Sequence, residues 1–569
     1  MALRGATSRR DGAPMTGDVD GALRADDPGS FGRALARVGS RMVTRPLPAM
    51  HWASRVTAGV AAAGAQSAAR ALGWQGQPAL APSAKDRRFS DPAWAGHPWF
   101  LAQRQAYLAW ARCMRDLPGA AGMEGVEARK AGFAVDMLVD SLAPTNFLWG
   151  NPAALRKAVE TKGASVVNGL RNLADDVSQN HARPRQVDAS AFDVGTNLAC
   201  TRGKVVFRND LIELIQYEPT TTTVFSVPLL MSPPWINRYY VMDLAPGRSF
   251  VEWAVGHGHT TFSISYRNPD SSMAGVGLSD YLLDGLGTAV DVVREITDVT
   301  EINLAGLCVG GTLSVMLQAW LAGAGQHTVR SSTLLNTLVD FSDPGPLAVF
   351  TDEQSVEEVE CRMADQGFLD GRVMATTFDA LRPNDLIWNY VAANWLMGDT
   401  PPAFDILAWN ADATRIPAAT HSQYLRAFYV DNRLARGSME LAGRPLRLGT
   451  VTTDTYVLGA REDHITPWTS SYATTRLLEE APVRFVLSSA GHIAGIVNPP
   501  GPKRVHWVNE SLPPTPEAWF EGAEQRQGTW WEDWAGWIAT RAGRRRPPHA
   551  MGSAAHPVLA EAPGTYVHT

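Results

Sequence analysis

The residues best suited to chemistry are Cys308 and the glycines that surround it in the run GLCVGG, residues 306–311. An apolar, strand-like segment precedes this run and a helical pattern follows it, which is typical of a nucleophile elbow. The central residue of an elbow has a strained backbone, so small residues are needed two positions to either side, and Gly306 and Gly310 fill these places. Gly311 extends the glycine run into the helix, whose N-terminus favours a thiolate. The motif predicts that Cys308 is a nucleophile.

An elbow of this kind predicts an acid after a later strand and a histidine after the last strand, in the order nucleophile, acid, base. Asp463 follows the strand-like run DTYVLGARED, and His492 follows VRFVLSSAGH. Both residues therefore stand at the C-terminal ends of strands, where open α/β sheets place their ligands. The sequence predicts a catalytic triad of Cys308, Asp463 and His492.

Neighbouring residues offer alternatives to this triad. Glu462 and His464 flank Asp463, but adjacent loop residues cannot all face one site, and His464 leads into the next helix. A supporting or core role is therefore the preferred interpretation of His464. His257 and His259 have the close spacing of metal ligands, yet no carboxylate or thiol set accompanies them, so core or loop positions are expected. No metal and no cofactor are predicted.

A tetrahedral intermediate also needs donors for its oxyanion. The backbone N–H of Val309, the residue after the nucleophile, is the first predicted donor. The second should come from the loop after an early strand, where LLMSPPWINRYY stands. Its prolines lack an N–H group, which leaves Trp235, Ile236 and Asn237, and we take Ile236 as the candidate.

A sulfur nucleophile suits acyl transfer from coenzyme A, because a protein thioester and the starting thioester are close in free energy. The protein thioester stays activated toward attack by an alcohol, whereas a serine ester would have lost that driving force. His492 would deprotonate Cys308. Asp463 would either orient His492 or help to deprotonate the attacking hydroxyl, and the sequence leaves both roles open.

The elements that position these residues are visible as changes of pattern along the chain. Residues 1–88 read as a variable segment, partly disordered and partly helical, whose helix over 31–72 packs on its own domain or adsorbs to a surface, the former being preferred. Residues 89–191 are mainly helical. Strand and helix patterns alternate through 192–569, apart from an insertion at about 341–445 that is expected to be a lid. We therefore predict an α/β-hydrolase fold with an inserted lid subdomain, preceded by a mainly helical N-terminal domain.

Composition excludes several classes of function. The 569 residues carry a net charge of -6 without a basic stripe, which argues against a nucleic-acid partner. None of the four cysteines forms a CxxC pair, so neither a disulfide scaffold nor a zinc site is expected and a reducing cytoplasm fits. No secretory signal and no transmembrane segment are recognised. The late tryptophans either pack in a core or line a site for an apolar ligand: Trp507, Trp519, Trp530, Trp531, Trp534 and Trp537.

Many ordered segments resemble one family, the polyhydroxyalkanoate synthases, from about Phe89 to the C-terminus. They are FSDPAW, PTNFLWGNPAAL, ETKGASVVNGLRNL, PPWINRYYVMDL, FSISYRNPD, GLCVGGT, LRPNDLIWNYV, FDILAWNADATRIP, GAREDHITPW, SSAGHIAGIVNPP and HPVLAEAPGTYV. The resemblance implies an acyltransferase that polymerises (R)-3-hydroxyacyl-CoA into polyester and releases coenzyme A, with its triad at Cys308, Asp463 and His492. It also implies a cytoplasmic homodimer on polyester granules, a lid that rearranges over the site, no metal or prosthetic group and, from the chain length, no need of a second subunit.

The resemblance leaves the length of the monomer open. The GLCVGG elbow is similar to that of short-chain, class I members, which suggests 3-hydroxybutyryl-CoA as the substrate. FDILAWNADATRIP and the nearby HSQYLR are similar to medium-chain, class II members as well.

Two other functions compete with a synthase. A cysteine hydrolase on the same fold, a thioesterase or polyester depolymerase, would share the triad and transfer the acyl group to water. A non-enzymatic granule-surface protein would use the alanine-rich N-terminal helix and the tryptophans, and it would keep all function in a Cys308→Ala variant.

Overall fold

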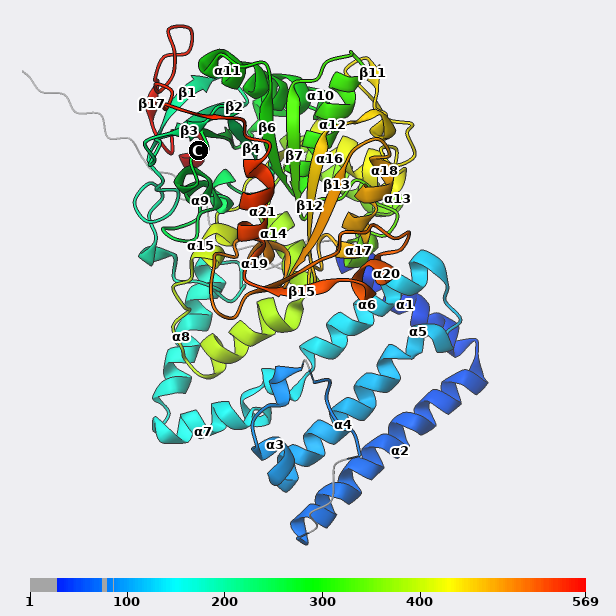
Figure 1. The fold of residues 1–569 in the computed structure, drawn as a ribbon. Helices are drawn as coiled ribbons and strands as arrows, with labels where there is room; N and C mark the ends of the chain where they lie inside the picture. Colours follow the sequence, from blue (N-terminus) through cyan, green and yellow to red (C-terminus); the bar gives the residue numbers. More distant parts are fainter. Residues whose placement is uncertain (1–27, 74–78, 85) are drawn as a thin grey trace, which may run out of the picture.

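The computed structural model describes residues 28–73, 79–84 and 86–569. Figure 1 shows two parts, a group of long helices from the N-terminal third and a larger part built around a twisted sheet. The predicted disorder of the first residues concerns mainly residues 1–27, which lie outside the described residues. The expectation that the chain carries no secretory signal concerns the same residues. Among the residues that are described, no helix is both long and apolar enough to cross a membrane.

The sheet has eleven strands in the order β15-β14-β13-β12-β7-β6-β4-β5-β2-β1-β17. Its members are β1 (Gly203–Arg208), β2 (Ile212–Tyr217), β4 (Leu229–Ser232), β5 (Thr261–Tyr266), β6 (Ile302–Leu307), β7 (Val329–Leu335), β12 (Asp454–Ala460), β13 (Val483–Ser488), β14 (Val505–Val508), β15 (Glu524–Gln527) and β17 (Ala560–Glu561). The strands from β5 through β13 pair in parallel, and those toward both edges pair antiparallel. Parallel pairing brings the C-terminal ends of β6, β12 and β13 to one edge of the sheet.

Helices cover both faces of this sheet, which explains why the central strands are buried along nearly their whole length. All six residues of β6 are buried. Leu304 points into the core beneath α11 (Thr288–Thr297) and α12 (Val309–Ala322), whereas Ala305 points to the opposite face. That face is covered by α9 (Phe250–Gly256) and α21 (Trp530–Ala539).

Most of the late tryptophans pack within these cores. The fully buried ones are Trp519, Trp530, Trp531 and Trp534. The ring of Phe250 lies 4.7–5.4 Å from three of them, measured between ring centroids. Packing is therefore the role of this cluster.

The N-terminal part is helical, as predicted. Its longer helices are α1 (Pro28–Val43), α2 (Pro46–Ala71), α4 (Pro98–Arg115), α6 (Gly125–Ser141), α7 (Pro152–Glu160) and α8 (Ala164–Gln179). The single helix expected over 31–72 is two helices, because Pro46 lacks the amide needed within a helix and instead occupies the first turn of α2. Helix α2 packs on α4, where Trp52 Nε1 donates to the Cys113 carbonyl at 2.8 Å.

The predicted insertion lies between β7 and β12. Its elements are α13 (Glu353–Gln366), α14 (Gly371–Leu381), α15 (Asp405–Ala411), α16 (Ala418–Tyr424), the pairs β8 (Phe368–Leu369) with β9 (Ile416–Pro417) and β10 (Glu440–Leu441) with β11 (Arg444–Pro445), and π-helical turns at Asn384–Trp388, Val391–Leu396 and Leu425–Val430. The start of the insertion lies against the N-terminal helices. The Phe31 ring centroid is 5.5 Å from that of Phe350, and Lys130 Nζ lies 2.7 Å from Asp352 Oδ1.

Candidate active site

Cys308 stands between β6 and α12 in the conformation of an elbow. Its backbone angles are φ 52° and ψ -122°, in a region that non-glycine residues rarely adopt. The Cys308 amide donates to the Leu335 carbonyl at 2.9 Å, which ties the turn to the end of β7. The thiol is partly exposed at the C-terminal edge of the sheet.

Close backbone approaches explain the glycines on both sides of Cys308. A Cβ atom on Gly306 would lie 2.5 Å from the Gly311 Cα, and one on Gly310 would lie 2.2 Å from the Ser232 carbonyl oxygen. A Cβ on Gly311 would lie 2.0 Å from Thr337 Oγ1. Real Cβ atoms do not approach so closely, so a larger residue at any of these positions would force the neighbouring atoms to move.

The structure brings Asp463 and His492 together beside Cys308. Asp463 follows β12, and His492 begins the short helix α19 (His492–Ile496) after β13. His492 Nδ1 donates to Asp463 Oδ2 at 2.6 Å, and the imidazole also forms a side-chain hydrogen bond with Cys308. The three residues thus form one connected chain of hydrogen bonds.

Charge within this hydrogen-bonded group shifts the pKa values of His492 and Asp463. Burial lowers the pKa of His492, but the charge of Asp463, followed by that of Cys308 and hydrogen bonds to both, outweighs burial and raises the pKa to about 10. Burial raises the pKa of Asp463, but His492 and the hydrogen bonds from Thr466 outweigh it and hold the pKa below its usual value. The arrangement therefore favours a protonated His492 beside the carboxylate of Asp463.

The alternative residues lie elsewhere. The Glu462 side chain is exposed. His464 is half-buried, and burial followed by the charge of Arg382 lowers its pKa to about 4. His259 is a core residue, with its ring 4.8 Å from that of Phe225 between centroids. In the described parts of the chain no group of three or more His, Cys, Asp or Glu side chains could hold a metal ion.

The two predicted oxyanion donors face the same space as Cys308. Val309 is the first residue of α12, so its amide has no acceptor within the helix. Among the three candidates on the loop after β4, Ile236 lines the cavity at Cys308, whereas Trp235 is buried in the core with 4% of its surface exposed.

Sequence reasoning missed two residues that hold the acid and the base in place. Thr466 Oγ1 donates to Asp463 Oδ2 at 2.8 Å and lies 3.1 Å from His492 Nδ1. Asn336, just after β7, donates from Nδ2 to the His492 carbonyl at 2.6 Å. The Asp-x-x-Thr spacing of 463–466 is a turn signal that could have identified Thr466, since Asp463 Oδ1 also accepts from the Thr466 amide at 2.9 Å. The role of Asn336 depends on tertiary contacts alone.

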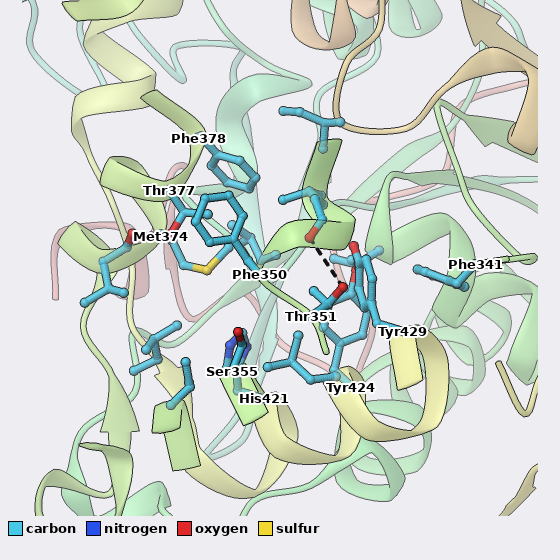
Figure 2. A pocket seen from close by; sticks show the side chains of 18 of the residues that line it. Phe341, Phe350, Thr351, Ser355, Met374, Thr377, Phe378, His421, Tyr424 and Tyr429 are labelled. Atoms are coloured by element: carbon cyan, nitrogen blue, oxygen red, sulfur yellow. Dashed lines mark hydrogen bonds between the residues drawn. The ribbon is translucent and has the colours of Figure 1, made fainter. Parts of the chain in front are cut away.

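An apolar cavity of about 120 Å³ adjoins Cys308, and the insertion forms most of its wall. In Figure 2, Met374, Thr377 and Phe378 lie on one side and Phe341, Tyr424 and Tyr429 on the other. The hydroxyl groups of Tyr424 and Tyr429 form a hydrogen bond, with their oxygens 3.4 Å apart. Cys308 thus lies under a cover of largely apolar side chains.

The chain matches two family models and several characterised relatives. The family described as poly-beta-hydroxybutyrate polymerase (PhaC) N-terminus matches residues 85–254, and the alpha/beta hydrolase fold family matches 248–499. The chain is 44% identical over 490 residues to the poly(3-hydroxyalkanoate) polymerase subunit PhaC of Cupriavidus necator, covering 85% of this chain and 83% of the relative.

A second relative, the poly(3-hydroxyalkanoate) polymerase of Methylorubrum extorquens, is 40% identical over 562 residues, with 98% of this chain and 92% of the relative covered. This alignment extends into the segment before Phe89, beyond the start of the resemblance seen in the sequence. Poly(3-hydroxyalkanoate) polymerase 1 of Ectopseudomonas oleovorans is 41% identical over 495 residues, covering 87% of this chain and 88% of the relative. The chain therefore belongs to the poly(3-hydroxyalkanoate) polymerase family and is an acyltransferase with an α/β-hydrolase fold.

Proposed function

We propose that this acyltransferase builds polyester through an acyl thioester on Cys308, with His492 as the base and Asp463 as the residue that orients it. The observation that carries the proposal is the hydrogen-bonded chain from Cys308 through His492 to Asp463 beneath an apolar cover. The substrate would be an (R)-3-hydroxyacyl-CoA, and the chemistry requires no further cofactor.

In the first half-reaction the Cys308 sulfur attacks the carbonyl carbon of the coenzyme A thioester. His492 holds the proton taken from the thiol and returns it to the departing coenzyme A thiolate. The amides of Val309 and Ile236 stabilise the negative charge that develops on the carbonyl oxygen. One thioester bond breaks and another forms, so the acyl group stays activated.

In the second half-reaction the hydroxyl oxygen of another hydroxyacyl unit attacks the acyl group on Cys308. An ester bond forms, the Cys308 sulfur leaves, and His492 carries the hydroxyl proton back to the sulfur. Water would give a free acid at this step, so the apolar cavity supports transfer to an alcohol by limiting the entry of water.

The surroundings of Asp463 support an orienting role. Its side chain is fully covered, and its oxygens accept from the Ile465 and Thr466 amides, the Thr466 hydroxyl and His492. A carboxylate with all these partners can fix the ring of His492 and stabilise its positive charge without reaching a substrate hydroxyl.

The volume of the cavity supports a short monomer, 3-hydroxybutyryl-CoA. An apolar cavity of about 150 Å³ holds one benzene molecule. The space of about 120 Å³ beside Cys308 is therefore of a size that suits a four-carbon acyl group.

The test incubates wild type and Cys308→Ala with four- and eight-carbon (R)-3-hydroxyacyl-CoA and follows coenzyme A release and polymer together. We expect polymer from the four-carbon substrate, a drop of at least about a thousandfold in Cys308→Ala, and an acyl group on the Cys308 peptide after an acid quench. Coenzyme A release with soluble acid alone would indicate a hydrolase, and full activity of Cys308→Ala would refute the nucleophile.

Association with a polyester granule in the cytoplasm and dimerisation belong to the same proposal. Exposed apolar side chains on the N-terminal helices support contact with a polyester surface, namely Val43, Leu47, Met50 and Val60. The homodimer rests on the family resemblance.

A further inference from the structure

Arg362 links the cavity at Cys308 to a second, much larger space. It lies on α13 of the insertion and lines the cavity that contains Cys308. It also lines a groove of about 1410 Å³ between the insertion and the N-terminal part. Phe31, Leu369 and Val373 likewise line both spaces, so the groove and the cavity share a wall. A ligand that reached from Cys308 into the groove would pass Arg362.

The guanidinium of Arg362 is free to bind an anion. Glu358, one helical turn earlier, is the expected partner, but its Oε1 accepts from Arg33 at 2.7 Å and from Gln354 at 3.0 Å. Within the described part of the chain Arg362 has neither a carboxylate nor a hydrogen-bond partner. The other arginines along the groove are each paired: Arg183 with Asp379, Arg185 with Asp176 and Arg372 with Asp370.

We propose that Arg362 binds a phosphate of the coenzyme A thioester and that the groove holds the nucleotide portion of coenzyme A. The proposal rests on the proposed function, because it assumes a thioester carbonyl at Cys308. Coenzyme A joins its sulfur to its phosphates through a long pantetheine arm, so a thioester at Cys308 must place anionic groups some distance away. Arginine suits phosphate because its planar guanidinium can donate two parallel hydrogen bonds.

The size and composition of the groove support this occupant. Its volume exceeds the roughly 300–1,000 Å³ of common ligand pockets. The cavity beside Cys308 is mostly apolar, and its two charged lining residues are Glu358, which Arg33 engages, and Arg362. The acyl group would thus occupy the apolar space, while the phosphates meet the unpaired cation at the wall that the cavity shares with the groove.

The experiment compares two substrates that carry the same 3-hydroxybutyryl group, one a coenzyme A thioester and the other an N-acetylcysteamine thioester without phosphates. Arg362→Met should raise KM for the coenzyme A thioester on the order of tenfold or more, since a hydrogen bond to a charged group is lost. The N-acetylcysteamine thioester should react as in wild type, which also shows that the variant is folded. Arg362→Lys should recover part of the loss, because it keeps the charge.

The matched control is Arg129→Met, which removes an exposed arginine from α6 that lines neither space. An equal loss with both substrates would mean that Arg362 supports the cover structurally and would overturn the proposal, as would unchanged kinetics with both. Equilibrium binding of coenzyme A itself separates this proposal from the proposed function. If wild type formed no polymer, weaker coenzyme A binding by Arg362→Met would still support the subsite, and equal binding would refute it.

Discussion

The side chains of Cys308, His492 and Asp463 act on one another through charge as well as geometry. The buried imidazole of His492 would ordinarily lose its proton, yet two acidic neighbours reverse the effect of burial and raise its pKa to about 10. In the proposed mechanism, an imidazole held beside a carboxylate in this way serves as the base.

Asp463→Asn tests this coupling directly. The variant should have a lower pKa at His492, because it lacks the carboxylate charge that outweighs burial, and NMR titration of the ring protons measures this pKa.

In wild type the raised pKa of His492 contributes stability that is fully present below the unfolded-state pKa of about 6.5 and is lost as the pH rises toward 10. The difference in free energy of unfolding between wild type and variant should narrow over that range. Glu462→Gln, at an exposed neighbour, is the control, and an unchanged His492 pKa in Asp463→Asn would contradict the coupling.

Sequence patterns predicted the residues that stand next to strand ends and missed those defined by tertiary contact. Cys308, Asp463 and His492 were each visible because a strand pattern ends just before them. Arg362 lies on an exposed-looking helix of the insertion, and nothing local marks it as a residue that borders two cavities. Its surroundings are set by α1, more than 300 residues earlier in the chain.

Among the elements, the strand–elbow–helix unit of β6 and α12 determines where the thiol stands. Its sequence signal is strong, because the glycines and the apolar strand are both local features. The insertion was predicted only as an interruption of the pattern. The π-helical turns within it, including Leu425–Val430, which carries Tyr429, have no periodicity that sequence reasoning recognises.

A glycine in the first turn of α12 and the glycine that follows its last residue allow a matched test of the elbow. Gly310→Ala should lower the free energy of unfolding by about 1–3 kcal/mol, because its Cβ would lie 2.2 Å from a backbone oxygen of β4. Gly323→Ala, at the other end of the same helix, should change it little, since the nearest atom to its Cβ would be 3.5 Å away. Chemical unfolding measures the free energy of unfolding of both variants. Equal values for the two would show that the close approach at Gly310 does not require glycine.

For the molecule as a whole, the N-terminal helices and the insertion form a shared boundary over the site. Arg33 on α1 engages Glu358, and Lys130 on α6 engages both Asp352 and Ser355. Because α13 also carries Arg362, the N-terminal part helps to hold the cover in position. The sequence predicted the helical part but gave no indication that it lies beside the insertion.

Lys130→Met should loosen the start of the insertion. Burial raises the pKa of Asp352, but the hydrogen bond from Lys130 and further contacts outweigh it and hold the pKa below its usual value. The pair therefore stabilises the fold above the unfolded-state pKa of about 4, and this contribution is lost as the pH falls through the lower folded-state pKa. We expect a loss of about 1–3 kcal/mol near neutral pH and faster hydrogen exchange in α13, with β12 unchanged. Arg55→Met, which breaks the exposed pair with Asp116, is the control, and unchanged exchange in α13 would refute the role of Lys130.

The pairing of β17 with β1 has a consequence for the order in which the sheet is completed during synthesis. Lys204 faces Glu561 across this edge, although 357 positions separate them in the chain. A growing chain therefore carries β1 with an unpaired outer edge until residues 560–561 leave the ribosome. Such an edge can pair with a strand of another nascent molecule, and contacts so distant in sequence form slowly. Until then the unfinished polypeptide exposes a strand edge that the folded protein covers.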